Sequence, residues 1–271
     1  MAIYLKKFET TSQYNAYTAS TEFITPNVSI CTTEGDVHYN PYVPPYDGFC
    51  KLILNNGETV ELESSGELTS AMTSAYSATV VSAEIGTQCT SIGKSTFEFC
   101  SGLTSIDIPD SVTSIGDNAF YRCSGLTSVI IPDRVTSIGH GAFTDCYSLT
   151  SIDIPDSVTI FGNSAFSSCS GLTSCTIGNS VTSIGVSAFY NCSSLTSVVI
   201  PDSVTSINTT SFYGCTSLTS VTVKATTPPT LGSYVFDNTN NCKIYVPSDK
   251  VNAYKTASRW STYADRIQAI P

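Results

Sequence analysis

The sequence predicts a solenoid, in which short coils of chain stack and each coil contacts only its neighbours. Cysteines recur every 23 residues, and a fixed period of roughly 20–50 residues is typical of stacked-repeat proteins. The segments between them are nearly identical, as in SGLTSIDIPDSVTSIGDNAFYRC at 101–123 and SGLTSVIIPDRVTSIGHGAFTDC at 124–146. Apolar residues keep the same places, so stacking superimposes them. The periodic cysteines are Cys100, Cys123, Cys146, Cys169, Cys192 and Cys215.

Each repeat is predicted to begin with a short strand and a turn. Residues 105–109 alternate polar and apolar side chains, as in a half-buried strand. Ile106 and Ile108 then face inward, whereas Asp107 faces outward. The turn Pro109-Asp110-Ser111 follows, where proline fixes φ and the polar side chains can bond nearby backbone donors. Equivalent strands of successive coils are expected to pair in a parallel ladder.

The second half of each repeat is predicted to contain another extended segment and a helical turn. Val112 and Ile115 form a second inward pair. Gly116 is expected to relax the backbone at the next corner. The apolar spacing within 119–123 suits one helical or 3-10 turn with its apolar side inward.

Stacking is expected to place one phenylalanine of each coil in a buried column, which should be the largest single stabiliser. Full burial of such a side chain contributes about 1.5–3 kcal/mol. The column is Phe97, Phe120, Phe143, Phe166, Phe189, Phe212 and Phe236.

The periodic cysteines are predicted to be free, buried thiols. Cys175 and Cys89 stand where other repeats have valine or isoleucine, so cysteine behaves here as a small hydrophobic residue. A ladder of disulfides stays open as an alternative, because column neighbours lie about one strand spacing, ~5 Å, apart.

Three segments are predicted: an N-terminal module and cap (1–77), the repeat array (78–242) and a C-terminal cap with a helix (243–271). In the first, we expect a short helix within 7–20, a loop over 26–50 and a β-hairpin over 51–62. The hairpin would turn at Asn56-Gly57.

The C-terminal cap is predicted to close the open end of the stack, as an array requires. Residues 244–246 read as a last strand, and Ser248 as the N-cap of a helix over 249–257. Trp260, Tyr263 and Ile267 are expected to cover the final coil.

Composition excludes several classes of partner. The net charge is −10, and nucleic acids or anionic membranes need a basic face. No run of 18 apolar residues predicts a membrane-spanning helix. The start, MAIYLKKFETT, shows no apolar core of a signal peptide, so cytoplasmic, secreted and virion locations all stay open.

Catalytic and metal sites are not expected. The chain has two histidines and no C-x-x-C, whereas structural zinc sites need clustered ligands. The repeating Asp110, Asp133, Asp156 and Asp202 either cap their own turns or recruit a cation. Asn179 in the same column favours capping. His140 is interpreted as a solvated corner residue, so a Ser-His-Asp triad is not predicted. We predict a protein that is no enzyme and holds no cofactor or metal.

The pattern L-T-S-I-x-I-P-x-S-V-T-S-I-G-x-x-A-F-x-x-C-S closely resembles the BspA-like leucine-rich repeat family over about 78–270. The end, KIYVPSDKVNAYKTASRWSTYADRIQAI, is similar to a C-terminal cap often seen with it. The N-terminal segment resembles modules of such proteins in gut commensals and their phages. The resemblance implies a right-handed superhelix of short parallel strands, found mostly on bacterial cell surfaces and linked to adhesion to host proteins or other cells. It implies no catalytic residue.

Displayed residues that vary between repeats are the candidate binding residues. Tyrosine and arginine often anchor interfaces, although neutral variation explains exposed positions equally well. The serine and threonine columns either offer hydroxyls to carbohydrate or suit solvent-facing strands. We predict a non-enzymatic adhesion module with a protein or glycan partner on another cell or host matrix. The alternative is a structural spacer in a surface or phage-tail assembly. The candidates are Asp107, Tyr121, Arg122, Ile130, Asp153, Tyr190, Asn191 and Tyr213.

Overall fold

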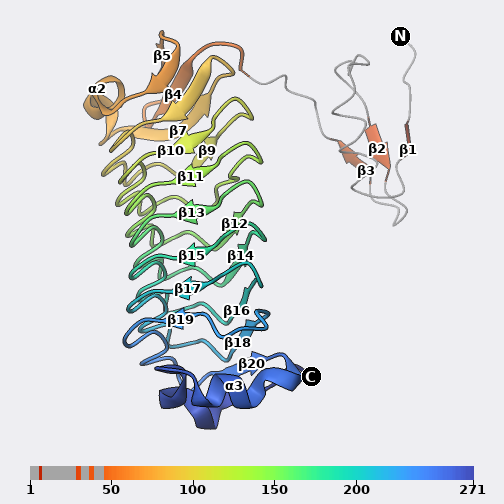
Figure 1. Cartoon of the computed structure of the whole chain (residues 1–271). Coiled ribbons are helices and arrows are strands. Elements are labelled where there is room, and N and C mark those ends of the chain that lie inside the picture. Colours follow the sequence, from red (N-terminus) through yellow and green to blue (C-terminus); the bar gives the residue numbers. More distant parts are fainter. Residues whose placement is uncertain (1–5, 8–28, 32–36, 40–45) are drawn as a thin grey trace. The chain divides into compact units, whose positions relative to one another are not determined.

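The computed structural model describes residues 6–7, 29–31, 37–39 and 46–271, in two units, 1–45 and 46–271 (Figure 1). In the first unit three strands form one sheet of order β1-β2-β3. They are β1 (Lys6–Lys7), β2 (Ser29–Cys31) and β3 (Val37–Tyr39). The short helix expected within 7–20 lies outside the described residues. β2 and β3 fall inside the segment expected to be loop, so that expectation is wrong where the two strands form.

The second unit begins with a sheet that joins the N-terminal cap to the array. The expected hairpin is formed by β4 and β5, which pair antiparallel on either side of Gly57 (φ 86°). β4 also pairs with β7, and β7 pairs in parallel with β9 of the next coil. The cap elements are β4 (Cys50–Leu54), β5 (Thr59–Leu62), β6 (Gly66–Leu68), α2 (Ser70–Thr73) and η1 (Ser74–Tyr76). The first two coils of the array contribute β7 (Val80–Ile85) and β9 (Ser105–Asp107).

One parallel ladder runs the length of the array, in the order β19-β17-β15-β13-β11-β10-β8-β6 (Figure 1). Paired residues of neighbouring strands occupy the same repeat position, as Ile115 and Ile138 do. This ladder is the second extended segment of each repeat. Its strands after β6 are β8 (Cys89–Ile92), β10 (Ser114–Ile115), β11 (Ser137–Ile138), β13 (Ile160–Phe161), β15 (Ser183–Ile184), β17 (Ser206–Ile207) and β19 (Thr230–Leu231).

The first strand of each repeat forms shorter ladders. Residues 128–131 run through their coil without forming a strand, which separates β9 from the later strands. The later strands are β12 (Ser151–Ile154), β14 (Ser174–Ile177), β16 (Ser197–Ile200), β18 (Ser220–Val223), β20 (Lys243–Val246) and β21 (Ile267–Ala269).

The third side of each coil is a chain of turns rather than a regular helix. The i to i−3 bonds of a 3-10 turn are present, as from Cys123 N–H to Phe120 O at 3.1 Å. Two residues per coil adopt left-handed conformations, here Asn118 (φ 53°) and Arg122 (φ 60°). These conformations aim alternate N–H groups at the next coil, and Phe120 N–H donates to Ala142 O at 2.7 Å. The turns therefore form a hydrogen-bonded ladder of their own.

The predicted phenylalanine column is confirmed. The seven rings from Phe97 to Phe236 stack with centroids 4.9 to 5.8 Å apart and planes within 12° of parallel. All seven are fully buried. Each inner ring stacks between the rings of the two neighbouring coils, so the column extends the core through successive coils.

Gly116 and its equivalents are needed for close approach rather than for backbone freedom, because their φ angles are not positive. A Cβ at Gly139 would lie 2.4 Å from Asp117 N, and one at Gly162 would lie 2.4 Å from His140 N. A side chain here would push neighbouring coils apart at the corner.

The ten cysteines whose side chains the structure describes are free. The periodic ones are buried, as predicted. Five of them also act as donors, which the sequence did not indicate: Cys123, Cys146, Cys169, Cys192 and Cys215. The thiol of Cys123 donates to Phe97 O at 3.0 Å, and that of Cys169 donates to Phe143 O at 3.1 Å. Each thiol thus satisfies a carbonyl of the preceding coil.

The C-terminal cap consists of η2 (Ser248–Lys250), α3 (Val251–Thr256), η3 (Trp260–Arg266) and β21. Trp260, Tyr263 and Ile267 are buried against the last coil, as expected. Ser248 lies inside η2 and caps no helix, because no side chain bonds the start of η2 or α3.

Two side chains of the cap replace the coil that would follow. The N–H of Phe236 donates to the Tyr263 hydroxyl at 3.3 Å. The guanidinium of Arg266 donates to Phe236 O at 3.1 Å and to Cys242 O at 2.8 Å. In the interior of the array, the next coil supplies these partners.

Candidate functional site

An exposed cluster of aromatic and charged side chains spans three successive coils on the turn side of the array. Phe99, Arg122 and Asp145 occupy the same repeat position, and Tyr121 and Tyr147 lie beside them in sequence. We call these five residues the Arg122 cluster. The turn ladder places them, because all three equivalent residues adopt left-handed φ angles of 60 to 62°.

Arg122 holds the cluster together. Its Cζ lies 5.2 Å from the centre of the Tyr121 ring and 5.8 Å from that of Phe99, so the cation faces two aromatic rings. Its Nε donates to Asp145 Oδ2 at 3.2 Å. Phe99 and Tyr121 also meet edge to face, with centroids 5.5 Å apart.

Contacts within the cluster raise the pKa of Arg122 and of Tyr147. The hydrogen bond that Arg122 donates to Asp145 raises the pKa of the Arg122 guanidinium. Desolvation, and then the negative charge of Asp145, raises the pKa of the Tyr147 hydroxyl. Both shifts favour a protonated Arg122 and a protonated Tyr147 at neutral pH.

Large apolar side chains of the cluster face solvent. Phe99 is 52% exposed and Tyr147 is 48% exposed. Other coils place serine or threonine where Tyr147 stands, at Ser101, Ser124, Ser170, Ser193 and Thr216. Exposed aromatic groups gathered around an arginine are typical of interaction surfaces.

A second tyrosine pair lies farther along the same turn column. Tyr190 and Tyr213 stack with centroids 5.3 Å apart and planes at 5°. Asn191 and Tyr213 line a shallow depression, together with Asn238 and Asn240. Thr144 and Ser167 occupy the intervening coils, so the two aromatic groups are separate.

Three predicted residues belong to another side of the coil. Asp107 and Asp153 face outward from β9 and β12, and Ile130, in the equivalent position between them, is 81% exposed. No contact joins them to the Arg122 cluster within the described residues. The structure thus divides the eight candidates between the strand face and the turn face.

Sequence reasoning missed Phe99, Asp145 and Tyr147. Phe99 lies in the degenerate first repeat, where departures from the consensus are hard to recognise. Asp145 and Tyr147 were visible as departures from their columns, but only the structure shows that both face Arg122 across a coil boundary.

The threonine columns serve the fold. The hydroxyl of Thr127 donates to Thr104 O at 3.2 Å, and that of Thr150 donates to Thr127 O at 3.3 Å. The same bond repeats along the column through Thr219. Because each donor is used between coils, these hydroxyls have only their acceptor sites left for a carbohydrate.

His140 and Asp156 also bond the neighbouring coil. His140 Nδ1 accepts from Asn163 N–H at 2.9 Å, so a backbone amide occupies the ring nitrogen that a triad would give to a carboxylate. Asp156 Oδ1 accepts from Asn179 N–H at 2.6 Å. Its own turn is closed by Val158 N–H and Pro155 O instead, so the expected capping role is wrong for Asp156.

The described part of the chain contains no group of three His, Cys, Asp or Glu side chains arranged to hold a metal ion. Within that part, no helix has the length and apolar character needed to cross a membrane.

Residues 71–196 and 182–263 match the family described as BspA type leucine rich repeat region, in 6 copies. The leucine-rich repeat protein of T. pallidum is 33% identical, with a TM-score of 0.52, over 56% of this chain and 70% of that one. A leucine-rich repeat protein from Bacteroides ovatus shares the fold, with a TM-score of 0.53 at 23% identity, over 84% of this chain and 71% of that one. No curated protein is significantly similar in sequence.

Proposed function

Because the chain belongs to the BspA-type leucine-rich repeat family, we propose that it is a non-enzymatic adhesion module that binds a partner through the turn face of its array. The partner is a protein or glycan on another cell or on host matrix. The module is presented outside the cell that makes it, on a bacterial surface or on a virion.

The Arg122 cluster is the observation that carries this proposal. Interface hot spots are enriched in tyrosine and arginine and are surrounded by less critical contacts. Here an arginine is already fixed by two aromatic rings and by Asp145, so little side-chain entropy is lost on binding. The rest of the array, with its serine, threonine and asparagine side chains, supplies a polar surround.

The alternative function is a spacer, whose surface would be uniformly polar. Phe99 and Tyr147 argue against it, because neither contributes to the buried column and both expose apolar area to water. The stacked Tyr190 and Tyr213 add a second anchor on the same face. Contact with the partner would be distributed along the array rather than confined to one deep pocket.

The test replaces cluster residues by those of other coils, which preserves the fold. Tyr121→Thr, Arg122→Asn and Tyr147→Ser copy the residues at Thr144, Asn191 and Ser170. The triple variant should keep its melting curve and bind cultured epithelial cells and immobilised matrix protein at least about tenfold more weakly. A second variant replaces Tyr121, Tyr190 and Tyr213 by serine, which tests the whole turn column.

The matched control changes the strand face, with Asp107→Ala, Ile130→Ser and Asp153→Ala. It should bind like the unchanged protein. Loss of binding in this control alone would move the site to the strand face. Unchanged binding in all three variants would leave the array as a spacer.

A further inference from the structure

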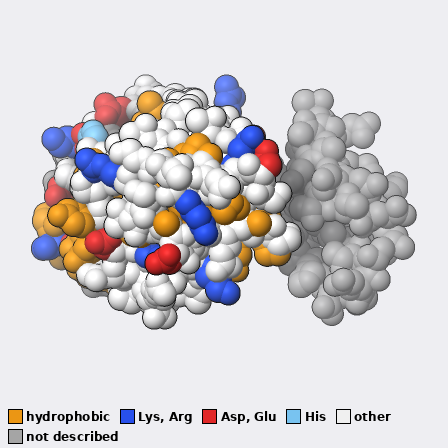
Figure 2. All heavy atoms as spheres, turned by 60° about the horizontal axis from the view of Figure 1, so that its bottom comes forward, with side chains coloured by type: hydrophobic (Ala, Val, Ile, Leu, Met, Phe, Trp, Pro, Cys, Tyr) orange, Lys and Arg blue, Asp and Glu red, His pale blue; other side chains and the backbone are white. Residues whose placement is uncertain are grey.

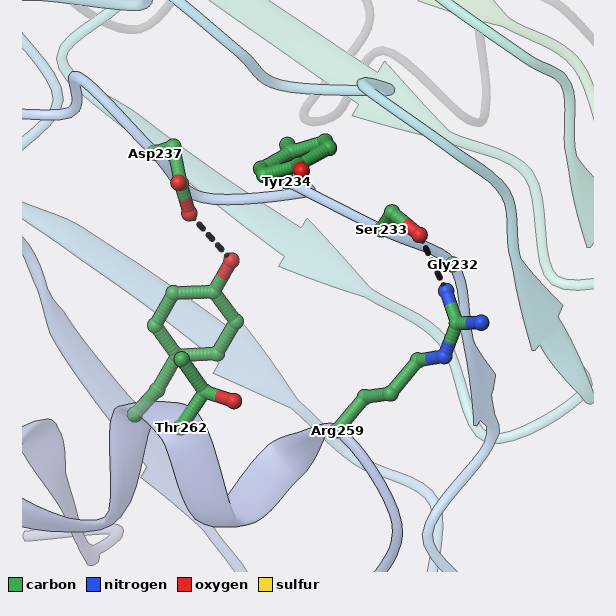
Figure 3. Close-up of a pocket in the computed structure, with 7 residues that line it drawn as sticks. Gly232, Ser233, Tyr234, Asp237, Arg259 and Thr262 are labelled. Carbon is green, nitrogen blue, oxygen red and sulfur yellow. Dashed lines mark hydrogen bonds between the residues drawn. The ribbon is translucent and has the colours of Figure 1, made fainter.

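A pocket of about 270 Å³ lies at the C-terminal end of the array, between the last turn and η3 (Figure 3). Arg259, which directly precedes η3, extends toward Ser233, and Tyr234 lies along the opposite edge. Tyr263 of η3 also lines the pocket and bonds Asp237. The pocket is on the cap, away from the Arg122 cluster in sequence, and it has room for one sugar ring.

Arg259 provides a cation with spare donors. Its Nη1 donates to the hydroxyl of Ser233. Within residues 46–271 no carboxylate lies within ion-pair distance of it, whereas a guanidinium has five N–H donors. Its backbone is left-handed, with φ at 63°.

Tyr234 is the exception in its column. The equivalent left-handed positions hold only small or polar residues, whereas Tyr234 (φ 58°) places a ring that is 62% exposed at the edge of the pocket. An aromatic residue is strained in this conformation. The other members are Ser95, Asn118, Gly141, Ser164, Ser187 and Thr210.

Asp237 provides an acceptor at the far end of the pocket. Its Oδ1 accepts from the Tyr263 hydroxyl at 2.6 Å, which leaves Oδ2 for another donor. Burial raises the pKa of Tyr263, so this hydroxyl stays protonated and keeps Oδ1 occupied. A ligand carboxylate is repelled at this end and attracted at Arg259.

The C-terminal end is the basic pole of an acidic chain. Residues 224–271 contain six lysines and arginines against three aspartates, a net charge of +3, whereas the whole chain is at −10. Figure 2 views this end and shows basic side chains spread over it. A polyanion is therefore drawn to the cap rather than to the array.

We propose that this pocket binds an acidic sugar residue, such as a uronic acid unit of an anionic polysaccharide. The carboxylate pairs with Arg259, the C–H face of the ring packs on Tyr234, and a hydroxyl donates to Asp237 Oδ2. This site is separate from the Arg122 cluster and does not depend on the function proposed for it.

The experiment titrates the full chain with glucuronate, methyl glucoside and acetate, and follows backbone amide shifts of residues 232–237 and 259–263 by NMR. Glucuronate should shift these amides in a saturable way, and the other two probes should bind at least about tenfold more weakly, since each lacks one half of the contacts. Arg259→Gly, which suits the left-handed backbone, and Tyr234→Ser, which copies Ser187, should each weaken glucuronate binding by about tenfold. Arg134→Ala removes an exposed arginine elsewhere and should have no effect.

Four outcomes would overturn the proposal. Absence of a saturable shift with glucuronate would remove the site. Equal binding of acetate would show a bare carboxylate site with no sugar specificity. A loss of glucuronate binding in Arg134→Ala equal to that in Arg259→Gly would show non-specific attraction to net charge. Short duplex DNA that displaces glucuronate equally well from the unchanged protein and from Arg259→Gly would show the same.

Discussion

The thiol of Cys146 lies 3.2 Å from the carbonyl oxygen of Phe120, one coil earlier, and donates a hydrogen bond to it. Cys123, Cys169, Cys192 and Cys215 make the same bond at 3.0 to 3.1 Å. The carbonyl belongs to the residue whose ring forms the buried column. Cysteine therefore fills volume and satisfies a backbone acceptor at one position, which valine cannot do.

Replacing Cys169 by valine should lower the free energy of unfolding by about 0.5–1.5 kcal/mol, because Phe143 O loses one of its two donors and keeps the N–H of Cys146 at 3.4 Å. Urea denaturation measures the change. Cys175→Val is the matched control, since Cys175 is only partly buried, takes a valine or isoleucine position and does not bond the preceding coil. Equal costs at the two positions would show that the thiol bond contributes nothing.

Stability should fall at alkaline pH. Burial raises the pKa of Cys100, Cys169 and Cys215 to about 12, against about 8.5 in an unfolded chain. The folded state thus holds protons that the unfolded state releases. The stabilisation is complete below about pH 8.5 and is lost as pH rises toward 12, at about 1.4 kcal/mol per pH unit for each thiol. Melting curves between pH 7 and 11 measure how steeply stability falls with pH. Cys100→Val removes one buried thiol and should reduce that slope by the contribution of one thiol. A flat profile above pH 9 would contradict the buried-thiol assignment.

Thiol reagents should distinguish native from denatured protein. The native periodic cysteines should react slowly at neutral pH, because they are buried and protonated. Denaturation without reductant should expose all 11 cysteines of the chain to a chromogenic disulfide. Few reactive thiols after denaturation would instead indicate the disulfide ladder.

Phe166→Ala should lower the free energy of unfolding by about 3–5 kcal/mol. The ring is stacked between Phe143 and Phe189, so its removal leaves a cavity between them. Asp156→Ala should cost about 1 kcal/mol, through loss of the exposed bonds to Asn179. Chemical denaturation of both variants provides the comparison. A larger loss for the aspartate would mean that its column binds a cation.

Removing the guanidinium of the cap should loosen the C-terminal coil first. Arg266→Ala removes the guanidinium donor of Cys242 O and leaves Phe236 O with the Thr239 hydroxyl alone. Hydrogen exchange should rise at residues 234–246 and stay unchanged at 103–126. Arg266→Lys keeps the charge but has no planar fork to reach both acceptors, so it should restore little protection. Uniform faster exchange along the array would show one cooperative unit with no separate cap.

The sequence was sufficient for the period, the buried columns and the two capped ends, because Phe120 and Ile115 recur in register and identical coils superimpose them. It was insufficient for the turn side, since nothing about Arg122 or Phe99 as residue types indicates a left-handed backbone. The thiol bonds and the threonine ladder were also hidden, because a donor is recognised only when its acceptor is placed. The Arg122 cluster depends on contacts between coils, which a column of aligned repeats does not show.

Nearly every bond between inner coils joins residues 22 to 26 positions apart, and the same pairs of repeat positions recur from coil to coil. One whole repeat can therefore be duplicated or deleted without creating a new kind of contact, since the flanking coils meet through the same phenylalanine, threonine and cysteine positions. Duplication or deletion of one repeat therefore changes the length of the array in a single genetic step. The β4–β5 hairpin at one end and the Tyr263 and Arg266 contacts at the other stay the same.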